Sequence, residues 1–399
     1  MIIEILLALL LGILAGTFTG IAPGIHINLV ALLLFVNSEL LLSITSPIVV
    51  ACFIVSMAIV HTFIDFIPSI FLGCPEESTA LSILPGHKLL LKGKGYEAIM
   101  LTTFGCYIGI ILLFLLVPLF IIFLPNIYET LNFLIPFVLI AASIFLIIKE
   151  KNPFLALTIF LFAGILGILT LNFYLIKEPL FPLLTGLFGI STILTSINQK
   201  TKLPEQKIIF EKFDKKEVFK ILPSSVISSS LCAFLPGLGS SQAAVLGSQM
   251  KKTEDERAFL FLLGSISTLV LGLNFAALYI IGKARSGTGI IIQKFLEEIT
   301  LTHLSLLLII MLISGSIAVF LSIFFVKIFI KYVSKIDYTK MNFVILIILI
   351  IMSVLISGWF SLFVLIISTA LGIIAINSGV KRMHLMGCLI VPVILYFLL

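Results

Sequence analysis

The stretch TGIAPGIHIN, Thr19 to Asn28, interrupts a strongly apolar run with a Pro-Gly pair and two polar side chains. The same kind of interruption recurs 213 residues later in CAFLPGLGSS, Cys232 to Ser241. Proline removes a backbone N–H donor and clashes with the preceding helical turn, and glycine permits backbone angles that end a helix. The sequence therefore predicts two broken helices, one near the start of each half of the chain.

The composition is that of an integral membrane protein. Of the 399 residues, 60% are hydrophobic and 11% are charged, and the mean hydropathy is +1.29. Soluble domains have roughly 45–50% apolar and about 25% charged residues. In lipid, spans are helices or closed barrels, and the apolar runs here lack the alternation of barrel strands. We therefore expect an all-α protein that crosses the membrane many times.

Charge and cysteine usage exclude several classes of function. The net charge of +6 is carried in loops between apolar runs, which favours membrane orientation over nucleic-acid binding. The five cysteines are scattered with no C-x-x-C pair, so neither a metal cluster nor a disulfide framework is predicted. No nucleophile–base motif appears, so we expect neither an enzyme nor a cofactor, although a coupling ion, H⁺ or Na⁺, remains open.

Apolar runs separated by breaks predict seven segments in each half of the chain. They lie near 2–22, 25–37, 47–73, 97–124, 130–148, 153–174 and 179–197, and near 221–236, 239–250, 257–282, 303–326, 341–357, 359–378 and 384–399. The charged stretch from Asn198 to Lys220 is too polar for lipid and predicts a surface linker. The predicted domains are a membrane repeat over 1–197, a linker over 198–220 and a second membrane repeat over 221–399.

Basic residues predict the orientation, because lysine and arginine favour the cytoplasmic side. If the first two segments of each half enter and leave on one side, each half adds five further crossings. With the linker inside, 21 of the 25 basic residues face the cytoplasm, including the Lys381–Arg382 loop and the 86–95 connection. We expect a multi-pass protein of the cell membrane with both termini outside. Whether segments 2–37 and 221–250 span fully or re-enter stays open.

An odd number of crossings per half predicts two inverted-topology repeats, each a broken-helix or re-entrant pair plus about five transmembrane helices. The Pro-Gly pairs align at an offset of 213, and a second match aligns IDFIPSIFLGCPEES over LNFAALYIIGKARSG at an offset of 209. The second match places Asn274 at the position of Asp65. Two matches in the same order with nearly equal offsets favour a repeat over chance.

The broken helices are the predicted substrate site. A break at membrane depth is tolerated where it lines a cavity, and the N-terminus of the following half-helix favours anions. The alternative is a simple packing kink. The candidate substrate-binding residues are Pro23, Gly24, His26, Asn28, Pro236, Gly237, Ser240, Ser241, Gln242, Asn274, Lys283 and Arg285. Arg285 could hold a carboxylate with two hydrogen bonds.

Ionisable residues inside an apolar helix are the predicted ion-coupling site. His61 and Asp65 are four residues apart, so they share a helix face, and such residues are typical of ion paths. A buried pair that only holds helices together is the equal alternative. Glu76 and Glu77 are further candidates, either as a cation site or as loop charges in water.

The motifs around these sites resemble the large membrane subunit of the tripartite tricarboxylate transporter family. The resemblance rests on GIAPGI (Gly20–Ile25), on AFLPGL (Ala233–Leu238) and on the stretch from Phe71 to Gly109. It implies a permease that moves organic carboxylates using an ion gradient. It also implies two partners, a small membrane subunit and an extracytoplasmic binding protein. A homo-oligomer is compatible with the sequence.

Three functions are compatible with these sequence features. The first is a secondary transporter that moves a small organic anion, a carboxylate above all, with a coupling cation by alternating access. The second is a lipid-phosphate (polyprenyl phosphate) translocase of similar architecture, since half-helix N-termini also suit a phosphate headgroup. The third is a membrane enzyme that acts on lipid-linked substrates. The sequence names neither the substrate nor the coupling ion.

Overall fold

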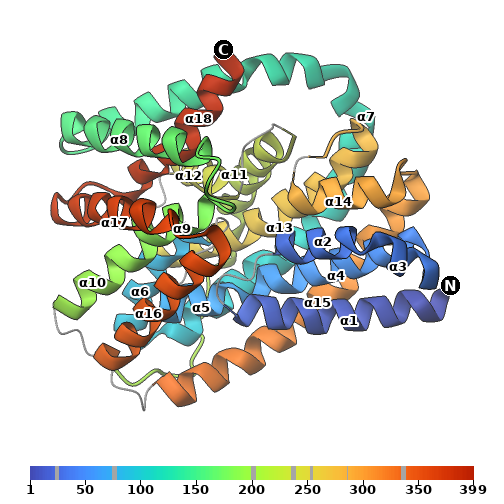
Figure 1. Ribbon diagram of the computed structural model, residues 1–399, viewed down its shortest axis with the longest axis horizontal. Coiled ribbons are helices and arrows are strands. Elements are labelled where there is room, and N and C mark those ends of the chain that lie inside the picture. Colours follow the sequence, from blue (N-terminus) through green and yellow to red (C-terminus); the bar gives the residue numbers. More distant parts are fainter. Residues whose placement is uncertain are drawn as a thin grey trace.

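The computed structural model describes residues 1–22, 27–73, 79–198, 204–234, 240–251, 255–284, 286–333 and 338–399, and every regular element in them is helical (Figure 1). The first half contains α1 (Ile2–Ile21), α2 (Ile27–Val36), α3 (Ser38–Ile44), α4 (Pro47–Ile64), α5 (Phe66–Leu72), η1 (Ala80–Ser82), α6 (Ile83–Leu91), α7 (Gly95–Ile148), α8 (Pro153–Leu171), α9 (Leu180–Leu184), η2 (Thr185–Ile190) and α10 (Ser191–Asn198). The second half contains α11 (Lys215–Phe234), α12 (Ser240–Lys251), α13 (Glu256–Ile280), α14 (Gly287–Leu296), α15 (Leu301–Val333), α16 (Tyr338–Ser357), α17 (Ser361–Asn377), η3 (Arg382–Met386) and α18 (Gly387–Leu398).

Six helical stretches of the described residues are long and apolar enough to cross a membrane. They are Ile2–Ile21, Pro47–Leu72, Gly95–Asn126, Pro153–Leu171, Glu256–Ile280 and Leu301–Tyr332. Shorter apolar helices accompany them, among them Pro136–Ile148, Asn342–Ser357 and Ser361–Asn377. The expectation of an all-α, multi-pass membrane protein is therefore confirmed.

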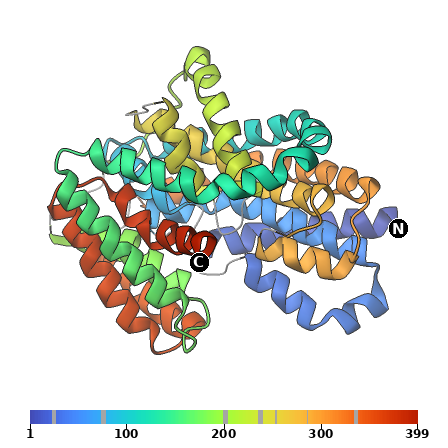
Figure 2. The same cartoon turned by 90° about the horizontal axis from the view of Figure 1, so that it is seen from above.

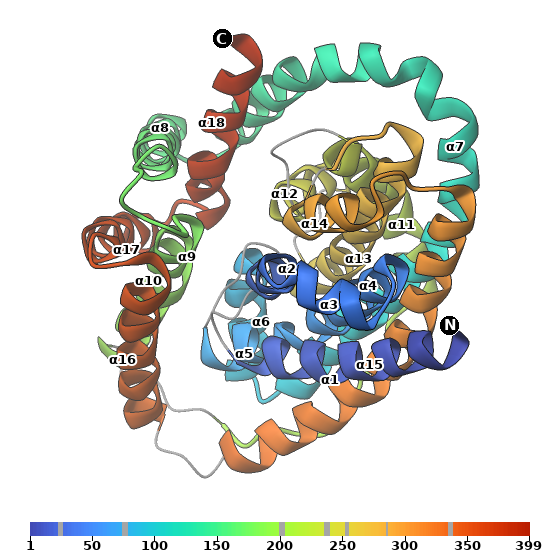
Figure 3. The ribbon, with the colours of Figure 1, turned by 45° about the vertical axis from the view of Figure 1, so that its right-hand side comes forward.

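One predicted boundary is wrong, because segments 97–124 and 130–148 form the single helix α7 of 54 residues. At 1.5 Å per residue a straight helix of that length would measure about 80 Å, far more than the roughly 30 Å hydrocarbon core. Pro118, Pro125 and Pro136 lie inside α7, and prolines bend helices without always ending them. Figure 3 shows the result, an arc that curves around the other helices.

Other boundaries differ in smaller ways. The 47–73 segment is divided at Asp65 into α4 and α5, and the 179–197 segment into α9, the π-helix η2 and α10. The helix expected to begin near 221 begins at Lys215, so α11 includes the last residues of the charged stretch. The 86–95 connection is largely helical, since α6 runs from Ile83 to Leu91.

Helices α4 and α13 form the centre of the molecule, and the side chains along nearly their whole length are buried. Glycines allow the neighbouring helices to pack close to α4 and α13. A Cβ on Gly12 of α1 would lie 2.6 Å from the Phe53 carbonyl oxygen of α4. A Cβ on Gly264 of α13 would overlap the Thr102 carbonyl of α7. Interhelical glycines of this kind are how membrane helices gain contact without a hydrophobic driving force.

The same packing order occurs around both central helices. Helix α4 packs on α1 and α15, while α13 packs on α11 and α7. Farther along the chain, α8 packs on α18, and α17 packs on η2 and α10. In Figures 1 and 2, α8, α16 and α17 gather on one side, away from α1, α2 and α14. Each long helix, α7 or α15, therefore contacts the central helix of the other half of the chain.

Candidate functional site

In the described part of the chain, helices lie on both sides of each Pro-Gly pair. Helix α1 ends at Ile21 and α2 begins at Ile27, and α11 ends at Phe234 before α12 begins at Ser240. The pairs themselves, Pro23, Gly24, Pro236 and Gly237, lie outside the described residues, as does His26. What the structure shows is one described helix before each pair and another after it.

The start of α12 is enclosed by protein. Ser240 and Ser241 occupy its first two positions, and both are buried. Gln242 follows in the same turn. Residues of η1 contact α12, and η1 also contacts η2. Helix α12, which begins with these two buried serines, therefore contacts an element of the first half of the chain.

The start of α2 contacts the start of another helix. The side-chain oxygen of Asn28 accepts a hydrogen bond of 3.0 Å from the Thr288 backbone N–H, in the first turn of α14. Ser286 caps the same helix, accepting from the Gly289 N–H at 3.1 Å. Two N–H donors at the α14 terminus are thus satisfied by protein, one of them by a predicted substrate-binding residue.

Asp65 and His61 form the buried pair that the sequence predicts. Asp65 Oδ2 lies 4.0 Å from His61 Nε2, and each side chain is 3% exposed. The other ring nitrogen, His61 Nδ1, lies 3.0 Å from Thr19 Oγ1 of α1. The pair sits where α4 passes into α5, inside one of the six candidate spans.

The remaining predicted residues divide into described and undescribed positions. Asn274, near the end of α13, is buried, and its Oδ1 atom has no hydrogen-bond partner. Lys283 is exposed beyond the end of α13. Glu76, Glu77 and Arg285 lie outside the described residues. No group of three metal-ligating side chains gathers in the part of the chain that is described.

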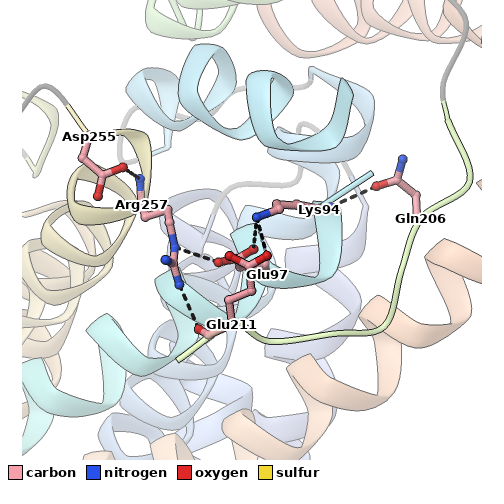
Figure 4. Close-up of polar contacts among 7 residues, drawn as sticks. Lys94, Glu97, Gln206, Glu211, Asp255 and Arg257 are labelled. Carbon is pink, nitrogen blue, oxygen red and sulfur yellow. Dashed lines mark hydrogen bonds and ion pairs between the residues drawn. The ribbon is translucent and has the colours of Figure 1, made fainter. Parts of the chain in front are cut away.

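A buried ionic network, shown in Figure 4, was not predicted from the sequence. Glu97, at the start of α7, is 1% exposed, and its carboxylate lies 2.7 Å from Arg257 Nε of α13 and 3.6 Å from Lys94 Nζ. Lys94 Nζ also lies 2.6 Å from Glu211 in the linker. Gln206 accepts from the Gly95 backbone N–H at 2.9 Å. The linker segment 204–213 is therefore tied to the starts of α7 and α13.

At the exposed end of the network, Lys94 and Glu211 form an ion pair. The Lys94 ammonium holds the pKa of Glu211 below its usual value, and the hydrogen bond to Glu211 raises the pKa of Lys94. In the sequence these residues resemble ordinary loop charges. The only available signal was that Glu97 and Arg257 each begin a predicted span, where a charge has to be paired or solvated.

Comparison with known proteins identifies the family. A protein of Methanocaldococcus jannaschii, named only as uncharacterized, is 33% identical over 411 residues, covering 98% of this chain and 99% of its own length. No solved structure matches the chain. Residues 6–387 match the family described as the tripartite tricarboxylate transporter TctA family. Because the match spans nearly the whole chain, the protein belongs to this family of multi-pass membrane transporters.

Proposed function

We propose that the protein is a secondary active transporter that moves a small organic anion, a carboxylate, together with H⁺ or Na⁺ by alternating access. The proposed coupling to a cation rests on the Asp65–His61 pair, whose side chains are each 3% exposed within a candidate span. Burying an ionisable carboxylate in a membrane helix is costly, and such residues are typical of ion and proton paths. Membership of a tricarboxylate transporter family supports the choice of a carboxylate over a lipid phosphate.

Two inverted repeats, 1–197 and 221–399 with a linker over 198–220, would supply the alternating states. The packing order supports this proposal, since α4 contacts α1 and α15 as α13 contacts α11 and α7. In transporters built this way, access alternates when one bundle rocks against the other around a central site. We propose that the linker faces the cytoplasm and that both termini lie outside.

The substrate site in this proposal includes the start of α12. The N-terminus of a helix favours an anion through its N–H groups and its dipole, and Ser240 and Ser241 bring hydroxyl groups to the first turn of α12. Asn28 and Asn274 are the other described candidates. The family description also supports two proposed partners, a small membrane subunit and an extracytoplasmic binding protein.

Ligand-dependent thermal stability of the purified full chain tests the function. Citrate, succinate and phosphate are compared with and without Na⁺ and at two pH values, because a ligand that binds the native state raises the melting temperature. We expect a carboxylate-specific shift that depends on Na⁺ or pH. The Asp65→Asn variant should keep the carboxylate shift but lose its dependence on the cation.

Asp214→Asn is the matched control, because Asp214 is an exposed carboxylate that accepts from the Lys216 backbone N–H at the start of α11. It should behave as the unaltered protein does. A carboxylate shift whose cation dependence survives in Asp65→Asn would make Asp65 structural. A shift with polyprenyl phosphate and with none of the soluble anions would contradict the carboxylate transporter.

A further inference from the structure

Arg382 is a buried cation. The sequence places it in a charged loop, yet in the structure it begins η3 with 6% of its surface exposed. Its Nη2 atom donates to the carbonyl oxygens of Leu187 and Phe188, at 2.7 and 2.8 Å, and to Ser191 Oγ at 2.9 Å. Its Nη1 atom donates to Thr192 Oγ1. All four acceptors are uncharged oxygens of η2 and α10.

The charge of Arg382 has no counter-ion among the described residues. None of the ion pairs found there includes it. Its Nε atom is buried and has no hydrogen-bond partner in the described part of the chain. A charge taken out of water costs free energy unless it is paired, and a neutral acceptor repays less of that cost than a carboxylate does. The guanidinium therefore keeps at least the Nε donor without an acceptor among the described residues, and its charge is uncompensated there.

Two more buried polar atoms without a hydrogen-bond partner among the described residues occur on the elements around Arg382. His87 Nδ1 of α6 is one, and Thr185 Oγ1 of the π-helix η2 is the other. His87 and Ile193 both lie next to Gly73. A Cβ on Gly73 would lie 3.4 Å from His87 Nε2 and 3.7 Å from Ile193 Cγ1. Ile193 directly follows Thr192, an acceptor of Arg382.

His87 carries no charge of its own at this place. Burial, and then the positive charge of Arg382, lower the pKa of the imidazole to about 4. At pH 7 the ring is neutral and offers one N–H donor and one acceptor. The surroundings of Arg382 thus combine one fixed positive charge with a neutral hydrogen-bonding ring, a pair that suits an anion with several oxygens.

The backbone near Arg382 is also specialised. η2 is a π-helix, a rare element that is frequent at functional sites. Gly73 has φ +67°, a left-handed conformation that other residues rarely adopt. η2 contacts η1, and η1 contacts α12. The Arg382 surroundings are thus connected through packed elements to α12, the helix that begins at the proposed transport site.

We propose that Arg382 binds a carboxylate group of the transported anion, through Nε and with His87 as a further hydrogen-bonding group. The proposal rests on the proposed function. It gives Arg382 the carboxylate-binding role that the sequence analysis predicted for Arg285. A guanidinium and a carboxylate form strong, charge-assisted hydrogen bonds with defined geometry. The carboxylate would supply both the missing acceptor and the missing charge.

The test compares citrate binding by the unaltered protein, Arg382→Lys and Arg382→Gln, with Arg257→Lys as the matched control. Arg257 is the chain's other described arginine, and it is already paired with Glu97. We expect both Arg382 variants to lose affinity for citrate roughly ten-fold or more, a difference of 1.4 kcal/mol for each factor of ten. Arg257→Lys should bind citrate normally. Normal citrate binding by folded Arg382→Lys overturns the proposal and leaves the proposed function standing.

Because Arg382 also satisfies carbonyl groups of η2, its variants could fail to fold. The unaltered protein then decides, through the rate at which phenylglyoxal modifies each of its three arginines. We expect citrate to slow modification at Arg382 and to leave Arg257 unchanged. Equal modification of Arg382 with and without citrate overturns the proposal. Protection by inorganic phosphate but by no carboxylate keeps an anion site at Arg382 and overturns the carboxylate transporter.

The chain itself offers two carboxylates as alternative partners for Arg382. Glu76 and Glu77 follow Gly73 by three and four residues in the sequence. The Glu76→Gln, Glu77→Gln double variant separates the two sources. If the transported anion is the partner, citrate protects Arg382 in this variant as it does in the unaltered protein. If the double substitution alone makes Arg382 react faster and abolishes the effect of citrate, the partner is the glutamate pair and the proposal is overturned.

Discussion

The Asn28 side chain accepts a hydrogen bond from the Thr288 backbone N–H across 260 positions of sequence, at 3.0 Å. This bond joins the first turn of α2 to the first turn of α14. Gly287 lies beside it, and a Cβ on Gly287 would lie 2.7 Å from Asn28 Cγ. The contact therefore needs both the amide at position 28 and the missing side chain at position 287.

Asn28→Ala should lower the free energy of unfolding by about 1 kcal/mol, the usual net value of one hydrogen bond. Asn28→Asp keeps the accepting oxygen and should cost less. Gly287→Ala should destabilise the protein by itself, because its Cβ would press on Asn28. In the double variant Asn28→Ala, Gly287→Ala this clash is relieved, so the combined loss should be smaller than the sum. Additive losses in denaturant unfolding would contradict the contact.

Arg257 and Glu97 form an ion pair of 2.7 Å in which the carboxylate is buried. Removing one partner of a buried ion pair costs about 3–5 kcal/mol, because the other charge stays buried. Glu97 is 1% and Arg257 23% exposed, so Arg257→Gln should destabilise more than Glu97→Gln. Lys88→Gln is the control, since its ion pair with Glu256 is exposed on the lysine side and should contribute less than about 1 kcal/mol. Thermal melts of the three variants give the order, and equal losses would contradict it.

The contact of the linker with Lys94 should depend on pH. The pKa of Glu211 is lowered by Lys94, so its contribution is present above the unfolded pKa and is lost as pH falls through the folded value. The pKa of Lys94 is raised, so its contribution is lost only as pH rises through a value above the usual 10.4 or so. Protease resistance of segment 204–213 should thus hold at neutral pH and fall in acid. Glu211→Gln should show no such acid-dependent loss, and an identical pH profile would exclude this ion pair as the cause.

The sequence was sufficient for features that depend on composition and local chemistry. It predicted the helical membrane class and the His61–Asp65 pair, because apolar length and i, i+4 spacing are local properties; the two helix breaks stay a prediction, since the Pro-Gly pairs lie outside the described residues. It missed the continuity of α7 across Pro118, Pro125 and Pro136, because tertiary packing decides whether proline bends or ends a helix. It also assigned Arg382 to a loop, since burial of that residue depends on η2, about 190 residues earlier.

Helix crossings should be sensitive to single methyl groups. Gly264→Ala places a Cβ against the Thr102 backbone carbonyl, where α13 crosses α7. A backbone atom cannot move away cheaply, so the helices have to separate, and overpacking of this kind typically costs about 1–3 kcal/mol. Gly289→Ala is the matched control, because its nearest neighbour is the Ser286 hydroxyl oxygen at 3.1 Å. A similar melting temperature for both variants would show that the α7–α13 crossing tolerates separation.

The inverted topology makes a prediction about which lysines share a side of the membrane. In a background without the native cysteines, single cysteines replace Lys92, Lys177, Lys283 and Lys381, all of which are exposed. The four described native cysteines are buried, so replacing them by alanine changes no exposed thiol.

The positive-inside pattern places Lys92 and Lys381 in the cytoplasm. An odd number of crossings in each half then places Lys177 and Lys283 outside. A membrane-impermeant maleimide applied to intact cells should therefore label positions 177 and 283, and label 92 and 381 only after the cells are opened. Labelling of 92 and 283 under the same condition would exclude inverted repeats, whereas reversal of all four would keep the repeats and turn the whole protein over.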